Sequence, residues 1–238
     1  MTRLSVNVNK IATLRNARGG NNPDIVQVVK DCERFGAEGI TIHPRPDERH
    51  ITTRDVYNIK EVVSTEFNIE GYPDDRLLQL IKDTHPDQAT LVPDGPDVLT
   101  SNAGWDVKKN TEYLKEIVDQ IKGMGVRVSL FMDPVKEQVE ALEKVNPDRI
   151  ELYTEAYASQ YKNGKESALR PYREATLLAS EMGFGINAGH DLDLENLRYF
   201  HQNIPNMEEV SIGHALFCDA LYFGLENTIQ LYLRQLKN

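Results

Sequence analysis

The sequence predicts an α/β protein that folds as a (β/α)8 TIM barrel, in a single domain over residues 1–238 with extra short helices. Eight short apolar or β-branched runs alternate with helical patterns, and no linker separates them. The chain has 238 residues, close to the roughly 250 that are typical of this barrel. An open, doubly wound sheet would show the same alternation, but the number of units and the length favour a closed barrel.

Each predicted strand is a short apolar or β-branched run that stops at a glycine, a proline or a charged residue. The first run, LSVNV, alternates apolar and polar residues, and the second, GITIH, is stopped by Pro44 and Pro46, which cannot continue a central strand. In chain order the predicted strands are residues 4–8, 39–43, 67–70, 88–92, 126–132, 149–153, 185–190 and 209–212.

Each predicted helix has apolar residues at helical spacing, and several start at a proline or an acid and end near a glycine. The first starts at Pro23-Asp24 and ends at Gly36. Pro171 is expected in the first turn of its helix, where its missing N–H is harmless. The predicted helices are residues 24–36, 53–65, 73–84, 106–123, 134–145, 168–182 and 194–201, followed by a closing helical region from 213 to about 236.

The longer connections are predicted to be irregular. Residues 11–20 turn between the first strand and the first helix. Residues 93–105 are rich in Gly, Pro and Asp and form a long loop that carries Thr100. Residues 154–166 are rich in tyrosine and small polar residues, which predicts a second long loop able to close over a site as a lid.

Composition excludes several classes of protein. Hydrophobic residues make up 40% of the chain and charged residues 27%, as in a soluble globular protein. The net charge of -10 disfavours nucleic acid and anionic membrane surfaces as partners, so an anionic ligand must be held by a local group of cations. No run approaches the ~20 apolar residues of a membrane span, and the chain enters its first strand without a signal sequence, which predicts a cytoplasmic location.

Two cysteines, Cys32 and Cys218, lie in apparently helical and partly apolar segments without CxxC or metal-ligand spacing. They are interpreted as reduced and structural. The first strand is not followed by GxGxxG, and the chain has no GxxxxGK[ST] phosphate loop. Neither dinucleotide nor nucleoside triphosphate binding is therefore predicted, and no cofactor is expected.

The stretch 39–52 is the richest in chemical groups. His43 ends the second strand, and in barrels the carboxyl ends of strands carry the reactive side chains. Arg45, Arg49 and His50 follow at once and supply cationic hydrogen-bond donors suited to a phosphate. A charged, solvated loop is the alternative interpretation of this stretch alone.

Ionisable groups end four of the eight predicted strands: His43, Glu70, His190 and His214. A barrel would bring all four to one mouth, with Asn7 from the first strand beside them. Taken singly, each has a structural explanation, such as a hydrogen-bonded histidine or a carboxylate paired with arginine. Together they can transfer protons near neutral pH, because imidazole titrates there and burial can raise a carboxyl pKa towards it.

Metal binding is the less favoured use of these groups, since the chain has neither HxH on a strand nor HExxH. Phosphate binding is favoured instead. The glycine turns at 188–191 and 212–216 allow backbone N–H groups to approach an anion at helix N-termini. Arg45, His50 and Arg18 are candidates for a second phosphate site, and two such sites suggest an enzyme that joins two phosphorylated molecules. Arg18 alone could equally be a surface or subunit-interface residue.

Six motifs together resemble the pyridoxine 5'-phosphate synthase family of vitamin B6 biosynthesis. They are VNxxxIATLRNARG at 6–19, GITIHxRxDxRHI at 39–51, NIE at 68–70, VSLFMD at 128–133, NAGH at 187–190 and IGHAL at 212–216. The resemblance implies a (β/α)8 barrel that assembles as a homo-octamer and works without a cofactor. It also implies condensation of 1-deoxy-D-xylulose 5-phosphate with 3-amino-2-oxopropyl phosphate to give pyridoxine 5'-phosphate, phosphate and water.

The same resemblance implies roles for individual residues. His43 and Glu70 match positions that act as proton acceptors, and His190 matches a proton donor. Positions that contact substrate in the family fall on Asn7, Arg18, Arg45, His50, Thr100, Gly213 and His214.

The chain departs from the family pattern at two places. Asn9-Lys10 stands where many relatives have Asp-His, so those two contacts are not carried over. Asp191 stands where glycine is common after NAGH. Its backbone N–H is expected to meet phosphate, while its carboxylate must point outward or be neutralised.

Two other functions stay open at this point. One is a phosphate-binding barrel lyase or isomerase that acts on a single sugar phosphate. The other is a catalytically silent barrel that binds a phosphorylated metabolite.

Overall fold

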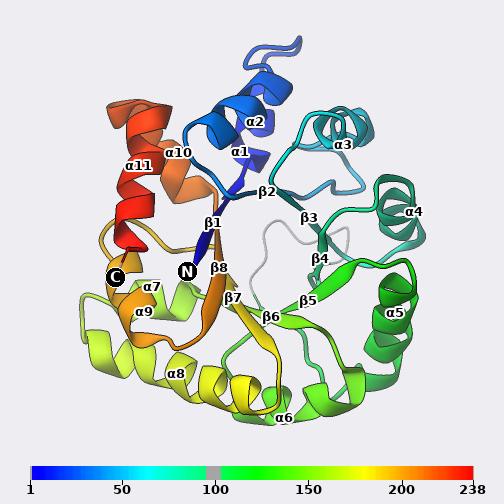
Figure 1. Cartoon of the computed structure of the whole chain (residues 1–238), viewed down its shortest axis with the longest axis vertical. Coiled ribbons are helices and arrows are strands. Elements are labelled where there is room, and N and C mark those ends of the chain that lie inside the picture. The colour runs from blue at the N-terminus through cyan, green and yellow to red at the C-terminus, as the bar shows by residue number, and fades with distance from the viewer. Residues whose placement is uncertain (1, 95–102, 238) are drawn as a thin grey trace.

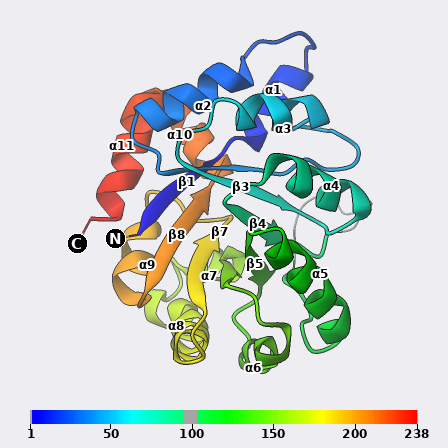
Figure 2. The ribbon, with the colours of Figure 1, turned by 45° about the vertical axis from the view of Figure 1, so that its right-hand side comes forward.

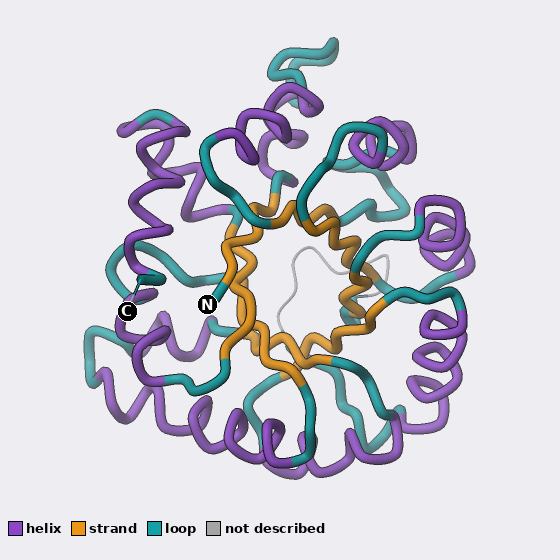
Figure 3. Tube along the Cα trace, in the orientation of Figure 1, coloured by secondary structure: helices purple, strands orange, loops and turns teal. Residues whose placement is uncertain are grey.

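Eight parallel strands close into a barrel in the order in which they occur along the chain, β1 to β8. The structure is a computed structural model that describes residues 2–94 and 103–237. β1 (Arg3–Asn7) pairs with β2 (Gly39–Ile42) on one side and with β8 (Met207–Ile212) on the other, which completes the closure (Figure 1). The predicted (β/α)8 barrel is thereby confirmed. Figure 3 shows the strands as an inner ring and the helices as an outer one.

The remaining strands and the helices follow the predicted alternation. The strands between β2 and β8 are β3 (Glu66–Gly71), β4 (Gln88–Leu91), β5 (Arg127–Met132), β6 (Arg149–Tyr153) and β7 (Gly185–Gly189). The helices are α1 (Asn9–Asn16), α2 (Ile25–Arg34), α3 (Thr53–Lys60), α4 (Asp75–Thr84), α5 (Thr111–Gly123), α6 (Lys136–Val145), α7 (Glu155–Gln160), α8 (Lys165–Glu181), α9 (Leu197–Asn203), α10 (His214–Phe223) and α11 (Leu225–Gln235). Figure 2 shows β1, β7 and β8 running side by side in one direction.

The strands present apolar side chains to the helices and polar side chains to the inside of the barrel. Each strand contributes a fully buried apolar residue to the outer layer, namely Val6, Ile40, Ile69, Ala89, Leu130, Ile150, Ala188 and Val210. Each also contributes a buried polar residue to the lumen, namely Ser5, Thr41, Asn68, Thr90, Ser129, Glu151, Asn187 and Glu209. The hydrophobic core therefore lies between the sheet and the helices, and the barrel interior is polar.

Hydrogen bonds inside the lumen connect neighbouring strands and strands two places apart. Ser5 and Thr41 bond through their hydroxyls at 2.8 Å, and the Asn68 amide donates to Thr41 at 3.2 Å. Thr90 donates to Asn68 at 3.1 Å and lies 3.4 Å from Glu151, which belongs to a strand two places away. A buried polar group is costly unless it is paired, so this network lets the interior stay polar.

The end of the lumen away from the carboxyl ends of the strands is closed by charged side chains. Glu66 pairs with Arg3 and Arg127, and Arg149 lies 2.5 Å from Glu208. Glu209 is 1% exposed, and neither of its carboxyl oxygens has a hydrogen-bond partner among the described residues. Burial, together with the charge of Glu66, raises the pKa of Glu209 to about 7.

Replacing Glu209 by glutamine should make the protein more stable than the wild type at pH 8 and change little at pH 5. The raised pKa means that the folded state holds the Glu209 proton more tightly than the unfolded chain. That contribution to stability is complete below pH 4.5 and is lost as the pH rises through 7. The expected gain at pH 8 is about 1–3 kcal/mol in the free energy of unfolding, from urea denaturation at both pH values. Glu208→Gln is the control, since it removes the negative charge next to Arg149 and should not stabilise at either pH.

The predicted turn at 11–20 is wrong over most of its length, because α1 occupies residues 9–16. This helix buries Ala12 and Arg15 but leaves Leu14 58% exposed, so it lacks the apolar stripe that identifies a helix in a sequence.

The predicted long loop at 154–166, expected to act as a lid, is also wrong. α7 lies there, and its Tyr157 is fully buried against Tyr172 and Phe200, with ring centroids 6.0 and 4.9 Å away.

Several helix boundaries also differ from the prediction. α8 starts at Lys165, which places Pro171 in its second turn rather than its first. α3 ends at Lys60 rather than at residue 65 and α5 starts at Thr111 rather than at 106, while Gly224, with φ 75°, divides the closing region into α10 and α11. The start of α2 is close to the expected one, since the Asp24 carboxylate caps it by accepting from Val26 and Gln27.

A buried ion pair joins α1 to the first turn of α3. Arg15 donates to both carboxylate oxygens of Asp55 at 2.6 and 2.7 Å, and both side chains are buried. Asp55 also accepts from the backbone N–H and hydroxyl of Thr52, which caps α3. The neighbouring Asn16 amide donates to the carbonyl of His50 at 2.8 Å. Together these contacts fix the segment that carries Arg45 and His50.

The two cysteines differ in environment. Cys32 is fully buried in α2, and burial raises the pKa of its thiol to about 12. Cys218 is exposed on α10, and its sulfur lies 3.7 Å from His214 Nε2. The structural interpretation therefore fits Cys32 and not Cys218.

Among the described helices, none combines the length and the apolar character that a membrane crossing requires.

Candidate active site

A cavity of about 520 Å³ opens at the carboxyl ends of the strands. This volume lies in the range of small-molecule sites. Three predicted catalytic residues line it: His43 directly after β2, Glu70 within β3 and His190 directly after β7. Residues far apart in the sequence thus meet because the barrel brings the ends of its strands together.

Three donors converge on one oxygen of Glu70. Asn7 Nδ2 donates to Oε1 at 3.1 Å, Asn9 Nδ2 donates to it at 3.4 Å, and His43 Nδ1 lies 3.5 Å away. Among the residues that the structure describes, no side chain bonds the other oxygen, Oε2. This oxygen is therefore the atom of Glu70 that remains available to take a proton from a ligand.

The pKa of Glu70 shifts in the opposite direction to the one predicted from the sequence. Burial raises it, but the hydrogen bond and charge of His43, the charge of His190 and the hydrogen bond from Asn7 bring the pKa below its ordinary value. Glu70 is thus an ionised base at neutral pH. The carboxyl with a raised pKa is Glu151, which is shifted well above its ordinary value by burial and by the charges of Glu70 and Glu209.

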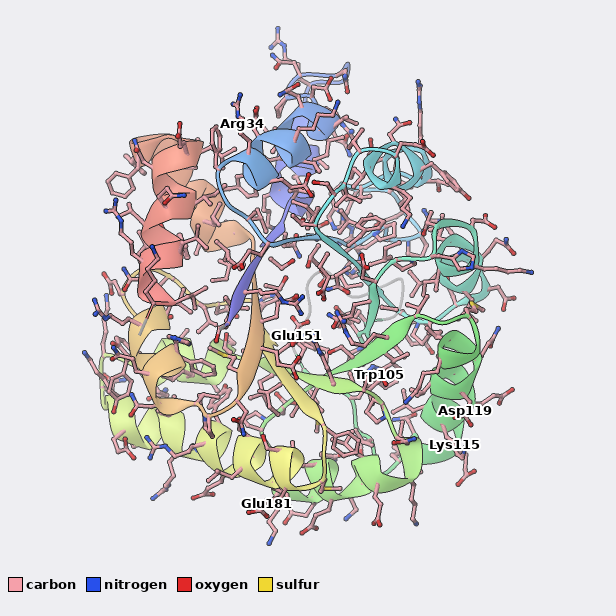
Figure 4. All side chains as sticks on the ribbon, in the orientation of Figure 1. Arg34, Trp105, Lys115, Asp119, Glu151 and Glu181 are labelled. Carbon is pink, nitrogen blue, oxygen red and sulfur yellow. The ribbon has the colours of Figure 1, made fainter. Side chains whose placement is uncertain are left out.

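Glu151 was not predicted as a site residue. It lies inside the ring of strands, whereas Arg34 and Glu181 lie on the outer helices (Figure 4). Gly189 makes room for it, since a Cβ on that glycine would lie 2.6 Å from Glu151 Oε1. A carboxyl group that stays protonated at neutral pH can donate a hydrogen bond to a developing negative charge.

Asn9 also escaped the sequence analysis, which set it aside as a departure from the family pattern. Its Oδ1 accepts from the backbone N–H of His43 at 2.8 Å, and its own N–H donates to Asn7 Oδ1 at 3.1 Å. Asn9 is 9% exposed and lines the cavity. It therefore connects the start of α1 to both His43 and Glu70.

His50 lines the cavity beside His43, with ring centroids 5.8 Å apart. Burial and the charge of His43 lower its pKa to about 4, so it is neutral and not a cation as predicted. Its Nδ1 accepts the backbone N–H of Ile51 at 3.0 Å. The ring hydrogen is consequently on Nε2, where it can donate to an anionic ligand.

The pKa of His190 shifts in the opposite direction to the pKa of His50. Burial lowers its pKa, but the hydrogen bond and charge of Asp191 and the charges of Glu70 and Asp94 raise it above the ordinary value. The Nδ1–Oδ2 distance to Asp191 is 2.6 Å. The Asp191 carboxylate is thus neutralised by its neighbour, and the Asp191 backbone N–H donates to Thr154 Oγ1 at 3.2 Å.

Cations and backbone donors surround the remaining cavity wall. Lys10, Arg45 and Arg49 line it on the side of β1 and β2. Next to β1, Gly213 and His214 line it after β8 at the start of α10, where no side chain of the described residues caps the helix. Free N–H groups at a helix start favour an anion. A Cβ on Gly213 would lie 2.8 Å from the carbonyl oxygen of Asn7, so this close approach requires glycine.

The structure does not place two predicted binding residues, Arg18 and Thr100, on this wall, for different reasons. Arg18 is exposed beyond the end of α1 and does not line the cavity. Thr100 lies outside the described residues. Within the described residues, no group of three or more His, Cys, Asp or Glu side chains is arranged to hold a metal ion.

Chemically, the cavity combines a carboxylate with a lowered pKa, an imidazole with a raised pKa and a carboxyl with a raised pKa within one cation-lined space. Glu70 can take a proton, His190 can give one, and Glu151 can donate a hydrogen bond. The cations and the start of α10 can hold phosphate groups at two places on the cavity wall.

Known proteins resemble the chain over its full length. The family model described as "Pyridoxal phosphate biosynthesis protein PdxJ" matches residues 4–238. The chain is 62% identical over 237 residues, covering 100% of both sequences, to the pyridoxine 5'-phosphate synthase of Cytophaga hutchinsonii. It is 59% identical over 236 residues, covering 99% of both, to the pyridoxine 5'-phosphate synthase of Porphyromonas gingivalis.

Solved structures with the same fold are much more distant in sequence. Phosphoribosyl anthranilate isomerase from Thermotoga maritima has a TM-score of 0.61 at 13% identity, with 99% of this chain and 98% of that one covered. The 3-keto-L-gulonate-6-phosphate decarboxylase from Vibrio cholerae has a TM-score of 0.64 at 10% identity, with 99% and 97% covered. At these identities the likeness shows a shared barrel fold.

Proposed function

The chain belongs to the PdxJ family of pyridoxal phosphate biosynthesis proteins, and we propose that it condenses 1-deoxy-D-xylulose 5-phosphate with 3-amino-2-oxopropyl phosphate. The products are pyridoxine 5'-phosphate, phosphate and water. Family membership makes the protein an enzyme of vitamin B6 biosynthesis that acts on phosphorylated small molecules. The assignment of individual residues to steps is our own proposal.

The observation that carries this proposal is the meeting of Glu70, His43 and His190 at one cavity with cations on its wall. An amine–ketone condensation with loss of water and ring closure needs several proton transfers at neighbouring atoms. Glu70 Oε2 and His43 take protons, and His190 returns them. The lowered pKa of Glu70 and the raised pKa of His190 fit these directions of proton transfer.

Two phosphate anchors position the substrates. We assign one to Gly213 and His214, and the other to Arg45 and His50, with Asn7 between them. The expectation that the Asp191 backbone N–H meets phosphate is wrong, because this N–H donates to Thr154 Oγ1. Holding both substrates by their phosphates turns a reaction between two molecules into an oriented reaction within one complex, which can contribute ~7–11 kcal/mol. Lys10 lines the same cavity and adds a further cation to its wall. Arg18 and Thr100 remain candidates for further substrate contacts.

Further features belong to the same proposal. The family resemblance implies a homo-octameric assembly and catalysis without a cofactor, and the sequence pattern predicts a cytoplasmic location and one domain over residues 1–238. Sedimentation velocity of the purified protein tests the assembly directly.

A product assay tests the proposed function. Purified protein supplied with both substrates should form pyridoxine 5'-phosphate, followed by chromatography, and neither substrate alone should be consumed. Turnover of one substrate alone would indicate a lyase or isomerase. Binding of both substrates without product would indicate a barrel that only binds phosphorylated metabolites.

A further inference from the structure

We propose that the Asp191 carboxylate is a positioning residue for His190: it holds the Nδ1–H of the imidazole and presents the Nε2–H to the substrates. The proposal rests on the role of His190 as the proton donor. It assigns a function to a side chain that the sequence analysis treated only as a group to be neutralised.

The contact between the two side chains is short and specific. Nδ1 of His190 lies 2.6 Å from Oδ2 of Asp191, the distance of a charge-assisted hydrogen bond. A carboxylate can only accept, so the hydrogen between them belongs to Nδ1. The ring then has one nitrogen left, Nε2, with which to act on a ligand in the cavity.

The backbone of both residues is fixed by buried side chains of neighbouring elements. The Asp191 N–H donates to Thr154 Oγ1, which itself donates to the carbonyl of Gly189 at 2.7 Å. The Asn196 amide donates to the Asp191 carbonyl at 3.2 Å. Thr154 is fully buried and Asn196 is 2% exposed. His190 itself has φ 91°, an unfavourable value for a residue with a side chain, which these contacts maintain.

The imidazole is also held by aromatic rings. Tyr153 meets it edge-on with ring centroids 5.2 Å apart, and Phe131 lies 6.4 Å away. These rings fix the plane of the imidazole, and the carboxylate fixes its rotation within that plane. An imidazole oriented by a carboxylate in this way is the arrangement that many proton-transferring enzymes use.

The charged and titratable groups that face His190 come from several elements. They are Asp191 itself, Glu70 of β3, Asp94 after β4 and Tyr153 of β6. Burial of the ring lowers its pKa, and the Asp191 hydrogen bond is the largest of the contributions that raise it. Removing the Asp191 charge should therefore make His190 lose its proton at lower pH.

Two substitutions separate charge from orientation. Asp191→Asn keeps the shape and an oxygen that can accept from Nδ1, but removes the charge. We expect the alkaline limb of the pH profile of kcat/KM to move down by roughly 1 pH unit, with little change in KM for either substrate. Asp191→Ala removes both, so we expect the same shift and a further drop in kcat.

The His190 pKa can be read without any activity. Diethyl pyrocarbonate reacts with the unprotonated imidazole, so the pH dependence of His190 modification, located by mass spectrometry, gives the pKa in each variant. This pKa should fall in Asp191→Asn by the same amount as the alkaline limb. Glu155→Gln is the control, since it removes an exposed carboxylate near Tyr153 that does not contact His190, and it should move neither quantity.

An unchanged His190 pKa and an unchanged alkaline limb in Asp191→Asn would overturn the proposal. If the wild-type protein formed no pyridoxine 5'-phosphate, the proposed function would fail, but the modification experiment would still decide whether Asp191 controls His190. If Asp191→Ala did not fold, the nearly isosteric Asp191→Asn would decide alone, with circular dichroism as the check of folding.

Discussion

Replacing Glu70 by glutamine should lower kcat by about 10²–10⁴-fold while leaving the fold intact. Glutamine keeps an oxygen that can accept from Asn7 and Asn9, the two amides that now hold Glu70 Oε1. It cannot take a proton, and the atom that replaces Oε2 becomes a donor. The measurement is the initial rate of pyridoxine 5'-phosphate formation with both substrates saturating.

The control for this variant is Glu61→Gln, which changes an exposed carboxylate just after α3 and should keep wild-type turnover. Circular dichroism of both variants separates loss of chemistry from loss of structure. Turnover near the wild-type value in a folded Glu70→Gln protein would remove Glu70 from the mechanism and leave His43 as the base.

Replacing Asp55 by alanine should destabilise the protein by about 3–5 kcal/mol. The change leaves the buried Arg15 guanidinium without the carboxylate that now accepts two hydrogen bonds from it. It also removes the cap that Thr52 and Asp55 form at the start of α3. The free energy of unfolding from urea denaturation measures the loss, and a weaker hold on residues 43–52 should raise KM through Arg45 and His50.

A double variant tests whether the ion pair itself is responsible. Arg15→Met combined with Asp55→Leu removes both charges and fills the space with apolar groups, so it should recover much of the stability that Asp55→Ala loses. A loss below about 1 kcal/mol in Asp55→Ala would mean that the pair does not anchor this segment.

The barrel could be predicted from the sequence because its regularity is local. Each strand is a short run with clear ends, and helices such as α2 have an apolar face and a capping residue, Asp24, that both appear in the chain. The elements that were missed lack such signals. α1 buries a charged residue, Arg15, instead of an apolar stripe, and α7 is held in place by tyrosine contacts to distant residues.

The meeting of His43, Glu70 and His190 at one cavity also followed from the sequence, because closure of a barrel fixes which strand ends are neighbours. The residues that contact these three side chains could not be predicted from the sequence. Glu151 was overlooked because it lies within a strand rather than at its end, although a carboxyl group in the otherwise apolar core of RIELY was an available signal. Asn9 was set aside because its contacts to His43 and Glu70 depend on the geometry of α1.

Protonation states were the least predictable part of the site. The pKa of the Glu70 carboxyl was expected to be raised by burial, and the His50 ring was expected to carry a positive charge. Both expectations failed because the outcome depends on which of burial and neighbouring charge is larger, and only coordinates give that balance.

The outward-facing apolar layer and the polar interior of the barrel have a consequence for redesign. The side chains inside the barrel, such as Glu151 and Thr90, belong to a different face of the sheet from those that pack against the helices. An engineer can therefore exchange interior residues for others that preserve the hydrogen bonds, for example Thr90→Ser, without removing apolar area from the helix-facing layer. The shape of the cavity floor can therefore be changed in this scaffold without loosening the contact between the sheet and its surrounding helices.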